Sequence, residues 1–234
     1  MRKLFVTLLV LVTITGNLWA QSPSVLGAWL LNNGGETHYL FFQDGFCFHT
    51  VKQGKTFVMS QGGNFEVTNG KLNMKVLYNS SDSTKVGEEM SLSFSLPDNQ
   101  LVLQMEEGEV KFSKIDDGKA PLAGVWKITG RMDADGKVAD IHQTGSRQTY
   151  KLLTGTKFQW VAIDPEKKQF SGTGGGSYSF KDGKYTENIE FFSRDNSRVG
   201  AALSFDGKLE DGKWHHSGLS SKGDKIYEIW GNAK

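Results

Sequence analysis

Cysteine and proline are scarce in this chain of 234 residues, which has one cysteine and four prolines. A single cysteine excludes an internal disulfide, so each folded unit must be stabilised by its own hydrophobic core. The cysteine, Cys47, stands in the apolar run Phe46-Cys47-Phe48, which is typical of a strand. There a buried, unpaired thiol behaves as a small apolar residue. A reactive or intermolecular thiol is the alternative.

The chain also lacks an excess of one charge and, after residue 20, any long apolar run. It has 27 Lys and Arg against 26 Asp and Glu, a formal net charge of +1, and no block of basic residues. This mixture argues against nucleic acid as a partner. Because a helix needs about 20 apolar residues to span a bilayer, we expect no integral membrane segment in the rest of the chain.

Residues 1–20 have the pattern of a cleavable signal peptide. Arg2-Lys3 precede an apolar run from Leu4 to Val12, and a short segment that ends at Ala20 follows. We expect cleavage near Ala20, which removes two positive charges and leaves a net charge of −1. No cysteine lies there to carry a lipid. The expected location is therefore secreted or periplasmic.

Glycine is abundant, with 28 residues. Dipeptides such as Asp-Gly and Asn-Gly separate short runs that are apolar or alternate between apolar and polar residues. Runs of this kind about every eight to twelve residues indicate antiparallel strands joined by hairpins, and we find no convincing helical stripe. The predicted fold class is all-β, with eight or nine strands in each half. We expect Gly62-Gly63 to separate strands over 56–60 and 64–68. An up-and-down meander of this length can close into a barrel, which removes its exposed edges.

The two halves of the sequence resemble each other. Gly27-Ala28-Trp29 returns as Gly124-Val125-Trp126, and Gly62-Gly63 returns as Gly175-Gly176. A period near one hundred residues matches a small domain rather than a solenoid repeat. The offset between the two copies is larger for the glycine pair than for the earlier Gly-x-Trp. This difference indicates an insertion in the second half, which we place over 132–146. We therefore predict tandem domains over 21–116 and 122–234, the first more divergent, with a polar linker over 117–121.

A glycine and a tryptophan on the first strand, followed by a run of hairpins, resemble lipocalin-like β-barrels of the calycin group. The second half is similar to secreted bacterial lipocalin-like domains of unassigned function. The residues that carry this second likeness are Gly124-Val125-Trp126-Lys127, Lys157-Phe158-Gln159-Trp160, Asp164-Pro165-Glu166, Gly172 to Tyr178, Tyr185 to Phe191 and Lys213 to Gly218. The resemblance implies two antiparallel up-and-down barrels with a cavity for a small ligand. Where typical lipocalins pack an arginine over the first-strand tryptophan, the final strands here offer Lys111, Lys114 and Lys225.

Candidate binding residues come from strand alternation in the second half. Adjacent residues on a strand point to opposite faces, so at most one of His215 and His216 faces the interior, and the pair is a poor metal site. Tyr185, Glu187, Ile189 and Phe191 should share one face. An inward glutamate is costly without a polar partner, and Glu228, His216, Tyr178 or Arg198 are candidates for that role. We predict a ligand site lined by Tyr150, Trp160, Tyr178, Glu187, Arg198 and His216, with no metal and no cofactor.

No enzyme class gains support. The run Gly172 to Gly176 lacks the Lys-Ser/Thr of a phosphate loop and is interpreted as a flexible hairpin or bulge. Glu187 and Glu190 diverge, unlike the paired carboxylates of glycosidases. The favoured function is an exported, non-catalytic protein that binds a small, partly apolar ligand in its second barrel.

Two alternatives remain open. The first is an interaction module with filled barrels, whose loops such as 132–146 contact a protein or glycan. The second is a barrel enzyme that acts on a small lipid or sugar. A sizeable cavity lined by several polar groups favours ligand binding, filled barrels favour the interaction module, and converging acid and base groups favour an enzyme.

Overall fold

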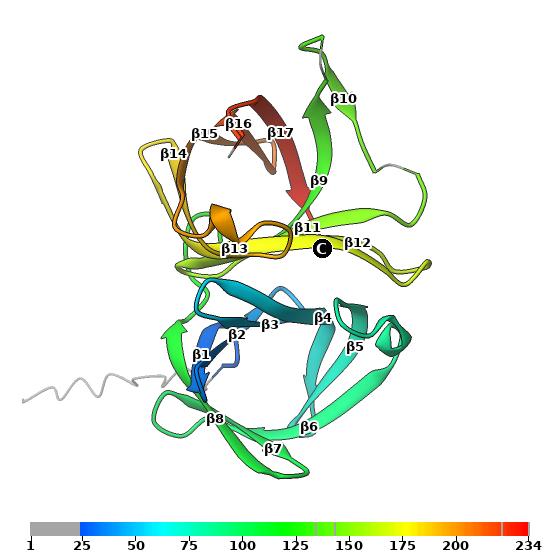
Figure 1. The fold of residues 1–234 in the computed structure, drawn as a ribbon, viewed down its shortest axis with the longest axis vertical. Coiled ribbons are helices and arrows are strands. Elements are labelled where there is room, and N and C mark those ends of the chain that lie inside the picture. The colour runs from blue at the N-terminus through cyan, green and yellow to red at the C-terminus, as the bar shows by residue number, and fades with distance from the viewer. Residues whose placement is uncertain (1–23, 134, 143, 221, 234) are drawn as a thin grey trace, which may run out of the picture.

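The computed structural model describes residues 24–133, 135–142, 144–220 and 222–233, and the predicted signal peptide lies outside this part of the chain. Two β-barrels lie side by side, and Figure 1 shows each of them as a ring. No α-helix occurs among the described residues, which form strands and two short 3-10 turns. The predicted all-β class is confirmed.

Barrel 1 is a closed, eight-stranded, antiparallel barrel in which every strand pairs with its neighbour in sequence and β8 pairs with β1. Its strands are β1 (Gly27–Asn33), β2 (Glu36–Gln43), β3 (Phe46–Gln53), β4 (Thr56–Thr68), β5 (Lys71–Asn79), β6 (Glu89–Ser95), β7 (Gln100–Met105) and β8 (Gly108–Asp116). A 3-10 turn, η1 (Ser83–Lys85), joins β5 to β6.

Barrel 2 repeats this topology and adds one strand. It is closed by the pairing of β17 with β9, and the extra strand β10 pairs with the other edge of β9. β10 lies within the insertion predicted over 132–146. The strands are β9 (Gly124–Met132), β10 (Val138–Asp140), β11 (Gln148–Leu153), β12 (Lys157–Asp164), β13 (Gln169–Lys181), β14 (Lys184–Phe192), β15 (Ala202–Glu210), β16 (Lys213–Leu219) and β17 (Lys225–Asn232), with the 3-10 turn η2 (Asn196–Arg198) after β14.

The paired glycines form the same β-bulge in each barrel. Register shifts occur between Gly62 and Gly63 in β4 and between Gly175 and Gly176 in β13. The prediction that Gly62-Gly63 separates two strands is therefore wrong, because one extra residue in the partner strand bends β4 without ending it. A Cβ on Gly63 would lie 1.8 Å from the Lys75 carbonyl oxygen, so only glycine fits this close backbone approach.

The second bulge also corrects the predicted face of Phe191. The shift opposite Gly175-Gly176 leaves Ile189 inside barrel 2 but turns Phe191 outward into the contact with barrel 1. Phe192 lines the interior in its place. Strand alternation fails here because a bulge adds a residue and exchanges the two faces.

The repeated tryptophans hold equivalent places on the first strand of each barrel. Trp29 Nε1 donates to the Val25 carbonyl at 2.7 Å, and Trp126 Nε1 donates to the Leu122 carbonyl at 3.0 Å. Both indoles are buried. Lys114 places its Nζ 4.9 Å from the Trp29 ring centroid, where the resemblance to lipocalins led us to look for an arginine. A lysine stem and ammonium therefore cover this indole.

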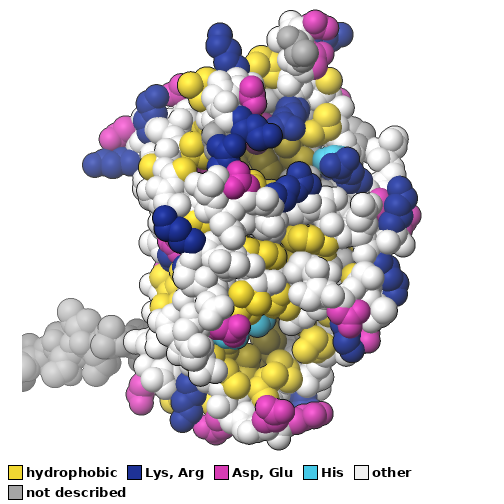
Figure 2. Space-filling model, in the orientation of Figure 1, with side chains coloured by type: hydrophobic (Ala, Val, Ile, Leu, Met, Phe, Trp, Pro, Cys, Tyr) yellow, Lys and Arg dark blue, Asp and Glu magenta, His cyan; other side chains and the backbone are white. Residues whose placement is uncertain are grey.

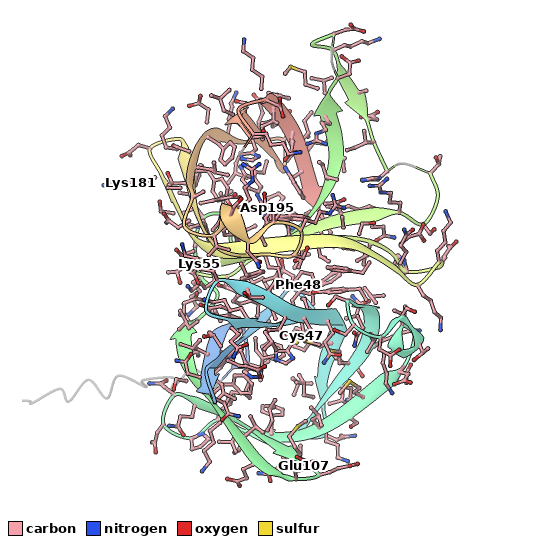
Figure 3. The ribbon with its side chains drawn as sticks, viewed as in Figure 1. Cys47, Phe48, Lys55, Glu107, Lys181 and Asp195 are labelled. Carbon is pink, nitrogen blue, oxygen red and sulfur yellow. The ribbon has the colours of Figure 1, made fainter. Side chains whose placement is uncertain are left out.

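A third apolar cluster joins the two barrels. The outer face of β3 meets β12, so Cys47 faces the interior of barrel 1 while its neighbour Phe48 packs between the barrels (Figure 3). Polar bonds cross the same contact: Thr50 Oγ1 donates to Gln159 Oε1 at 2.8 Å, and Gln159 Nε2 donates to Ser60 Oγ at 2.9 Å. Buried amide and hydroxyl groups are thereby satisfied across the contact.

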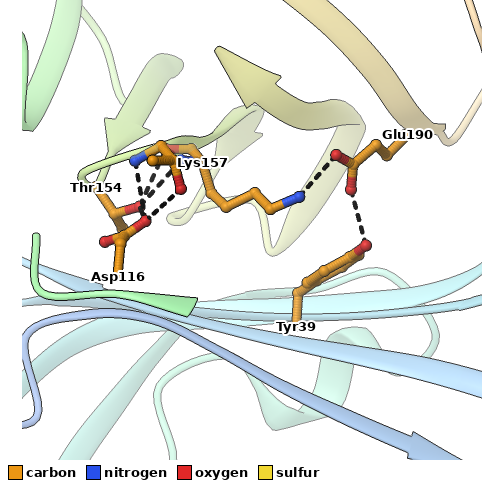
Figure 4. Close-up of polar contacts among 6 residues, drawn as sticks. Tyr39, Asp116, Thr154, Lys157 and Glu190 are labelled. Carbon is orange, nitrogen blue, oxygen red and sulfur yellow. Dashed lines mark hydrogen bonds and ion pairs between the residues drawn. The ribbon is translucent and has the colours of Figure 1, made fainter. Parts of the chain in front are cut away.

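Two hydrogen-bonded carboxylates flank this cluster (Figure 4). Glu190 accepts from Tyr39 Oη and from Lys157 Nζ, both at 2.7 Å. At the end of β8, Asp116 accepts from Thr154 Oγ1 and from the Gly155 backbone N–H, both at 2.8 Å. Burial alone would raise the pKa of Asp116, but the backbone N–H donors outweigh burial and lower it. The two barrels are thus held together by an apolar patch, and the polar groups at its edges form hydrogen bonds across the contact.

Candidate functional site

Barrel 1 encloses an apolar hollow of about 310 Å³. Its walls come from the inward side chains of the barrel: Leu31, Asn33, His38, Leu40, Phe42, Cys47, His49, Gln61, Leu72, Met74, Met90, Leu92, Leu103, Met105, Val110 and Phe112. Neither lysine nor arginine is among these described lining residues. A hollow of this size lies at the lower end of the range for small-molecule sites, about 300 to 1,000 Å³.

Two histidines contribute to the polar part of this wall, together with Asn33 and Gln61. His38 on β2 and His49 on β3 stack with their ring centroids 5.4 Å apart, and His38 Nδ1 lies 3.2 Å from His49 Nε2. Burial, and secondarily the neighbouring His38, lowers the pKa of His49 to about 4. At neutral pH His49 is therefore uncharged. The sequence analysis missed this pair because the two residues are brought together only by the register of the β2–β3 hairpin.

Cys47 belongs to the same wall. Its side chain is 3 % exposed, and burial raises the pKa of the thiol. A thiolate is the reactive form of cysteine, so this environment suppresses its reactivity. The predicted behaviour of Cys47 as a small apolar residue agrees with its place in the lumen.

Barrel 2 holds a smaller hollow of about 230 Å³ with charged walls. Four of the six predicted site residues line it together: Trp160, Glu187, Arg198 and His216. Figure 2 shows both hollows on one face of the molecule, the lower one with an apolar floor and the upper one edged by lysine and arginine side chains. The two lumens therefore open in the same direction with different chemistry.

The other two predicted residues lie elsewhere. Tyr150 is on the outer face of β11, where its ring meets Phe46 of barrel 1 at 5.2 Å and its hydroxyl contacts Gln148. Tyr178 is in the packed interior of barrel 2, but its hydroxyl donates to the Thr154 carbonyl at 2.7 Å and does not line the hollow. Burial raises the pKa of both phenols. The structure assigns these two tyrosines to packing contacts.

A buried ion pair crosses the barrel 2 lumen. Lys151 Nζ lies 2.5 Å from Glu187 Oε1, and the two side chains are 5 % and 7 % exposed. The ammonium is surrounded by aromatic rings whose centroids lie 5.0–5.4 Å away: Tyr185, Trp214, Phe158 and Trp230. Cation–π attraction and the carboxylate together offset the cost of removing this charge from water. Lys151 is the partner of Glu187 that the sequence analysis did not consider.

His216 and Glu228 form a second polar pair in the wall of the same lumen. His216 Nδ1 lies 3.5 Å from Glu228 Oε2, and Arg131 Nη2 lies 3.2 Å from Glu228 Oε1. Burial lowers the pKa of His216, partly opposed by Glu228. Burial alone would raise the pKa of the Glu228 carboxyl. The contact with His216 and the positive charges of Lys151 and Arg131 outweigh burial and lower this pKa. A neutral imidazole therefore faces an ionised carboxylate.

The prediction that only one residue of the His215-His216 pair faces inward is confirmed. His216 lies in the lumen, whereas His215 is on the outer face, with its Nδ1 2.8 Å from Tyr227 Oη. Within the described ranges, no group of three or more His, Cys, Asp or Glu side chains is placed to hold a metal ion. In the same part of the chain, no helix has the length and apolar character needed to cross a membrane.

An open groove also lies on the surface of barrel 1. It measures about 430 Å³ and lies over β4, β5 and β6, where polar residues such as Asn64, Lys75 and Glu89 line it. A groove of this kind lacks the enclosing apolar walls that typical small-molecule sites have. The enclosed lumens are the better candidate sites.

The strand order of each barrel defines its fold. In topology, each half of the chain is an up-and-down antiparallel barrel, an arrangement that eight-stranded lipocalin barrels also have. No protein-family model and no curated protein matches the sequence. Among solved structures, the chain is similar to a lipocalin-like protein from Bacteroides uniformis at 15 % identity, with 48 % of this chain and 99 % of that chain covered and a TM-score of 0.35. The fold assignment rests on the strand pairing itself.

Proposed function

We propose that this protein is an exported, non-catalytic binding protein for small molecules and that the lumen of barrel 1 holds a neutral, apolar ligand. The observation that supports this proposal is the 310 Å³ hollow with walls of leucine, methionine and phenylalanine. Export rests on the signal-like sequence over residues 1–20. The sequence analysis placed the ligand in the second barrel, but the apolar lumen of barrel 1 is the larger of the two.

Two features favour ligand binding over an interaction module with filled barrels. Both barrels retain a hollow, and the wall of the barrel 1 hollow includes Met74 and Met90. Methionine side chains are unbranched and adapt to differently shaped apolar molecules. Among the few polar groups of this wall, the pair of His38 and His49 offers a place for a hydrogen bond. An apolar cavity with few polar groups is the usual form of a small-molecule site.

The test uses the neutral fluorophore phenylnaphthylamine as a probe for the full chain. We expect its emission to rise on binding, and decanol to displace it better than decanoate, because a carboxylate buried among these walls would meet no lysine or arginine of the described lining. Filling the lumen with Leu92→Trp should reduce probe affinity at least about tenfold, equivalent to about 1.4 kcal/mol.

Ser93→Trp is the matched control. Ser93 follows Leu92 on β6 and is exposed, and adjacent residues on a strand point to opposite faces. This variant should bind the probe as the parent chain does. Absence of probe binding by the parent, or an equal loss in both variants at unchanged Tm, would exclude barrel 1 as the site.

A further inference from the structure

We propose that the lumen of barrel 2 is a second and chemically different site, which binds a small organic acid that also carries a hydroxyl group. The hydroxyl would donate to His216 deep in the lumen, and the acid would lie against Arg131 at the mouth. This site lies in a different lumen from the one in the proposed function, so a test of one site does not decide the other.

The first observation is an unused acceptor at the wall of the cavity. His216 is 2 % exposed, and neither of its ring nitrogens has a hydrogen-bond partner, although Nδ1 lies 3.5 Å from Glu228 Oε2. Since Glu228 is a carboxylate facing Nδ1, and a carboxylate only accepts, the imidazole proton belongs on Nδ1. Nε2 then presents a lone pair, which a hydroxyl of a ligand can satisfy. A buried polar atom without a partner is costly, so a donor that fills this place gains affinity.

The second observation is the charge of the lining. Each of the three cations of the lining has a carboxylate partner: Lys151 pairs with Glu187, Arg131 with Glu228, and Arg198 with Asp195. The pair of Lys151 and Glu187 is buried in the interior, whereas Arg131 lies toward the mouth. The Arg131 side chain is 54 % exposed there. A guanidinium has five N–H donors, more than its contact with Glu228 uses, and planar carboxylates match its geometry.

The third observation is the wall between these two polar ends. Trp160, Ile189, Phe192, Leu203 and Ile226 line the hollow with aromatic and aliphatic surface. A volume of about 230 Å³ is below the usual range for drug-sized ligands, about 300 to 1,000 Å³. The arrangement therefore suits a compact molecule with an apolar or aromatic body, a hydroxyl at one end and an acid at the other.

The experiment measures binding of three related probes to the full chain by isothermal titration calorimetry. Para-hydroxyphenylacetate has the hydroxyl and the acid, phenylacetate lacks the hydroxyl, and tyramine has an ammonium in place of the acid. We expect para-hydroxyphenylacetate to bind roughly tenfold tighter than phenylacetate, which is the scale of one hydrogen bond to a buried acceptor. Tyramine should bind more weakly than either acid because its ammonium would lie against the Arg131 guanidinium, which repels it.

Two variants assign the ends of the ligand. His216→Leu should remove the difference between para-hydroxyphenylacetate and phenylacetate. Arg131→Gln should weaken both acids about tenfold, because a charge-assisted hydrogen bond is lost. Lys208→Gln is the matched control, since Lys208 is an exposed cation on β15 that pairs with Glu210. None of these variants touches the lumen of barrel 1, so its binding of phenylnaphthylamine should persist.

Three results would overturn the second site. They are no binding of either acid by the parent chain, equal affinity for the two acids, and an effect of Lys208→Gln as large as that of Arg131→Gln. If His216→Leu fails to fold, the comparison of the two acids on the parent chain decides the role of Nε2 alone.

Discussion

Matched inward positions of the two barrels carry opposite chemistry. The residue that pairs with the first-strand tryptophan is Leu40 in barrel 1 and Lys151 in barrel 2. Counted from the shared glycine bulge, Met74 on β5 corresponds to Glu187 on β14. Two apolar lining residues of one barrel thus correspond to a buried ion pair in the other. The same backbone accepts both because the two charges of barrel 2 neutralise each other.

The next layer repeats this exchange. On the last two strands, the cross-strand pair Leu103–Val110 of barrel 1 corresponds to His216–Glu228 of barrel 2. Paired inward residues therefore change together, and the result is one apolar and one charged lumen on a common scaffold. The comparison teaches that the fold fixes the hollow and that a few inward positions fix its chemistry.

The largest expected effect comes from breaking the ion pair of barrel 2. Glu187→Met, which introduces the residue of barrel 1, leaves the Lys151 ammonium buried without its carboxylate. The free energy of unfolding should fall by about 3–5 kcal/mol. Adding Lys151→Leu should recover most of this loss, since the double variant reproduces the apolar pair. Urea denaturation followed by tryptophan fluorescence measures both, and a double variant as unstable as Glu187→Met would contradict the matching of the two barrels.

The next effect is a pH dependence that originates in barrel 1. Because the folded protein lowers the pKa of His49 to about 4, the unfolded chain takes up a proton first as the pH falls below the ordinary value near 6.5. Stability from this group is complete above pH 6.5, declines between 6.5 and 4, and is constant below 4. The loss should amount to roughly 3 kcal/mol.

The measurement compares urea midpoints of the parent chain and His49→Leu across this pH range. The difference between the two curves isolates His49 from the carboxylates that titrate nearby. His216→Leu should flatten the curve less, because Glu228 opposes the effect of burial on His216. A parent chain and a His49→Leu variant with parallel curves would show that His49 takes up its proton as freely as in the unfolded chain.

The barrels themselves were predictable from the sequence because alternation and glycine turns are local. The repeat of Gly-x-Trp, the strand class and the single inward histidine of the His215-His216 pair follow from side-chain periodicity. The bulge at Gly62-Gly63 was not predictable, because a glycine pair ends a strand as readily as it bends one. Phe191 was then assigned to the wrong face by the same missing information.

The candidate sites were harder, for a physical reason. The polar and apolar groups that meet in a lumen come from different strands. The register between distant strands cannot be derived from the sequence of either strand alone. Lys151 lies in the run Tyr150-Lys151-Leu152-Leu153, where a charge indicates solvent unless its partner Glu187 on β14 is known. Tyr150 was predicted inward for the same reason. Alternation along β11 gives the two faces but does not say which of them holds the lysine.

The smallest effect tests how each barrel covers its first-strand tryptophan. Lys114 covers Trp29 in barrel 1, and the position that pairs with Trp126 on the last strand of barrel 2 is Asn232. Lys114→Met keeps most of the apolar stem and removes the charge, so stability should fall by about 0.5–1 kcal/mol. Lys114→Arg should preserve or increase it, since a guanidinium stacks on an aromatic face. Urea midpoints resolve these differences, and a methionine variant as stable as the parent would mean that the stem alone covers Trp29 and that the ammonium contributes no measurable stability.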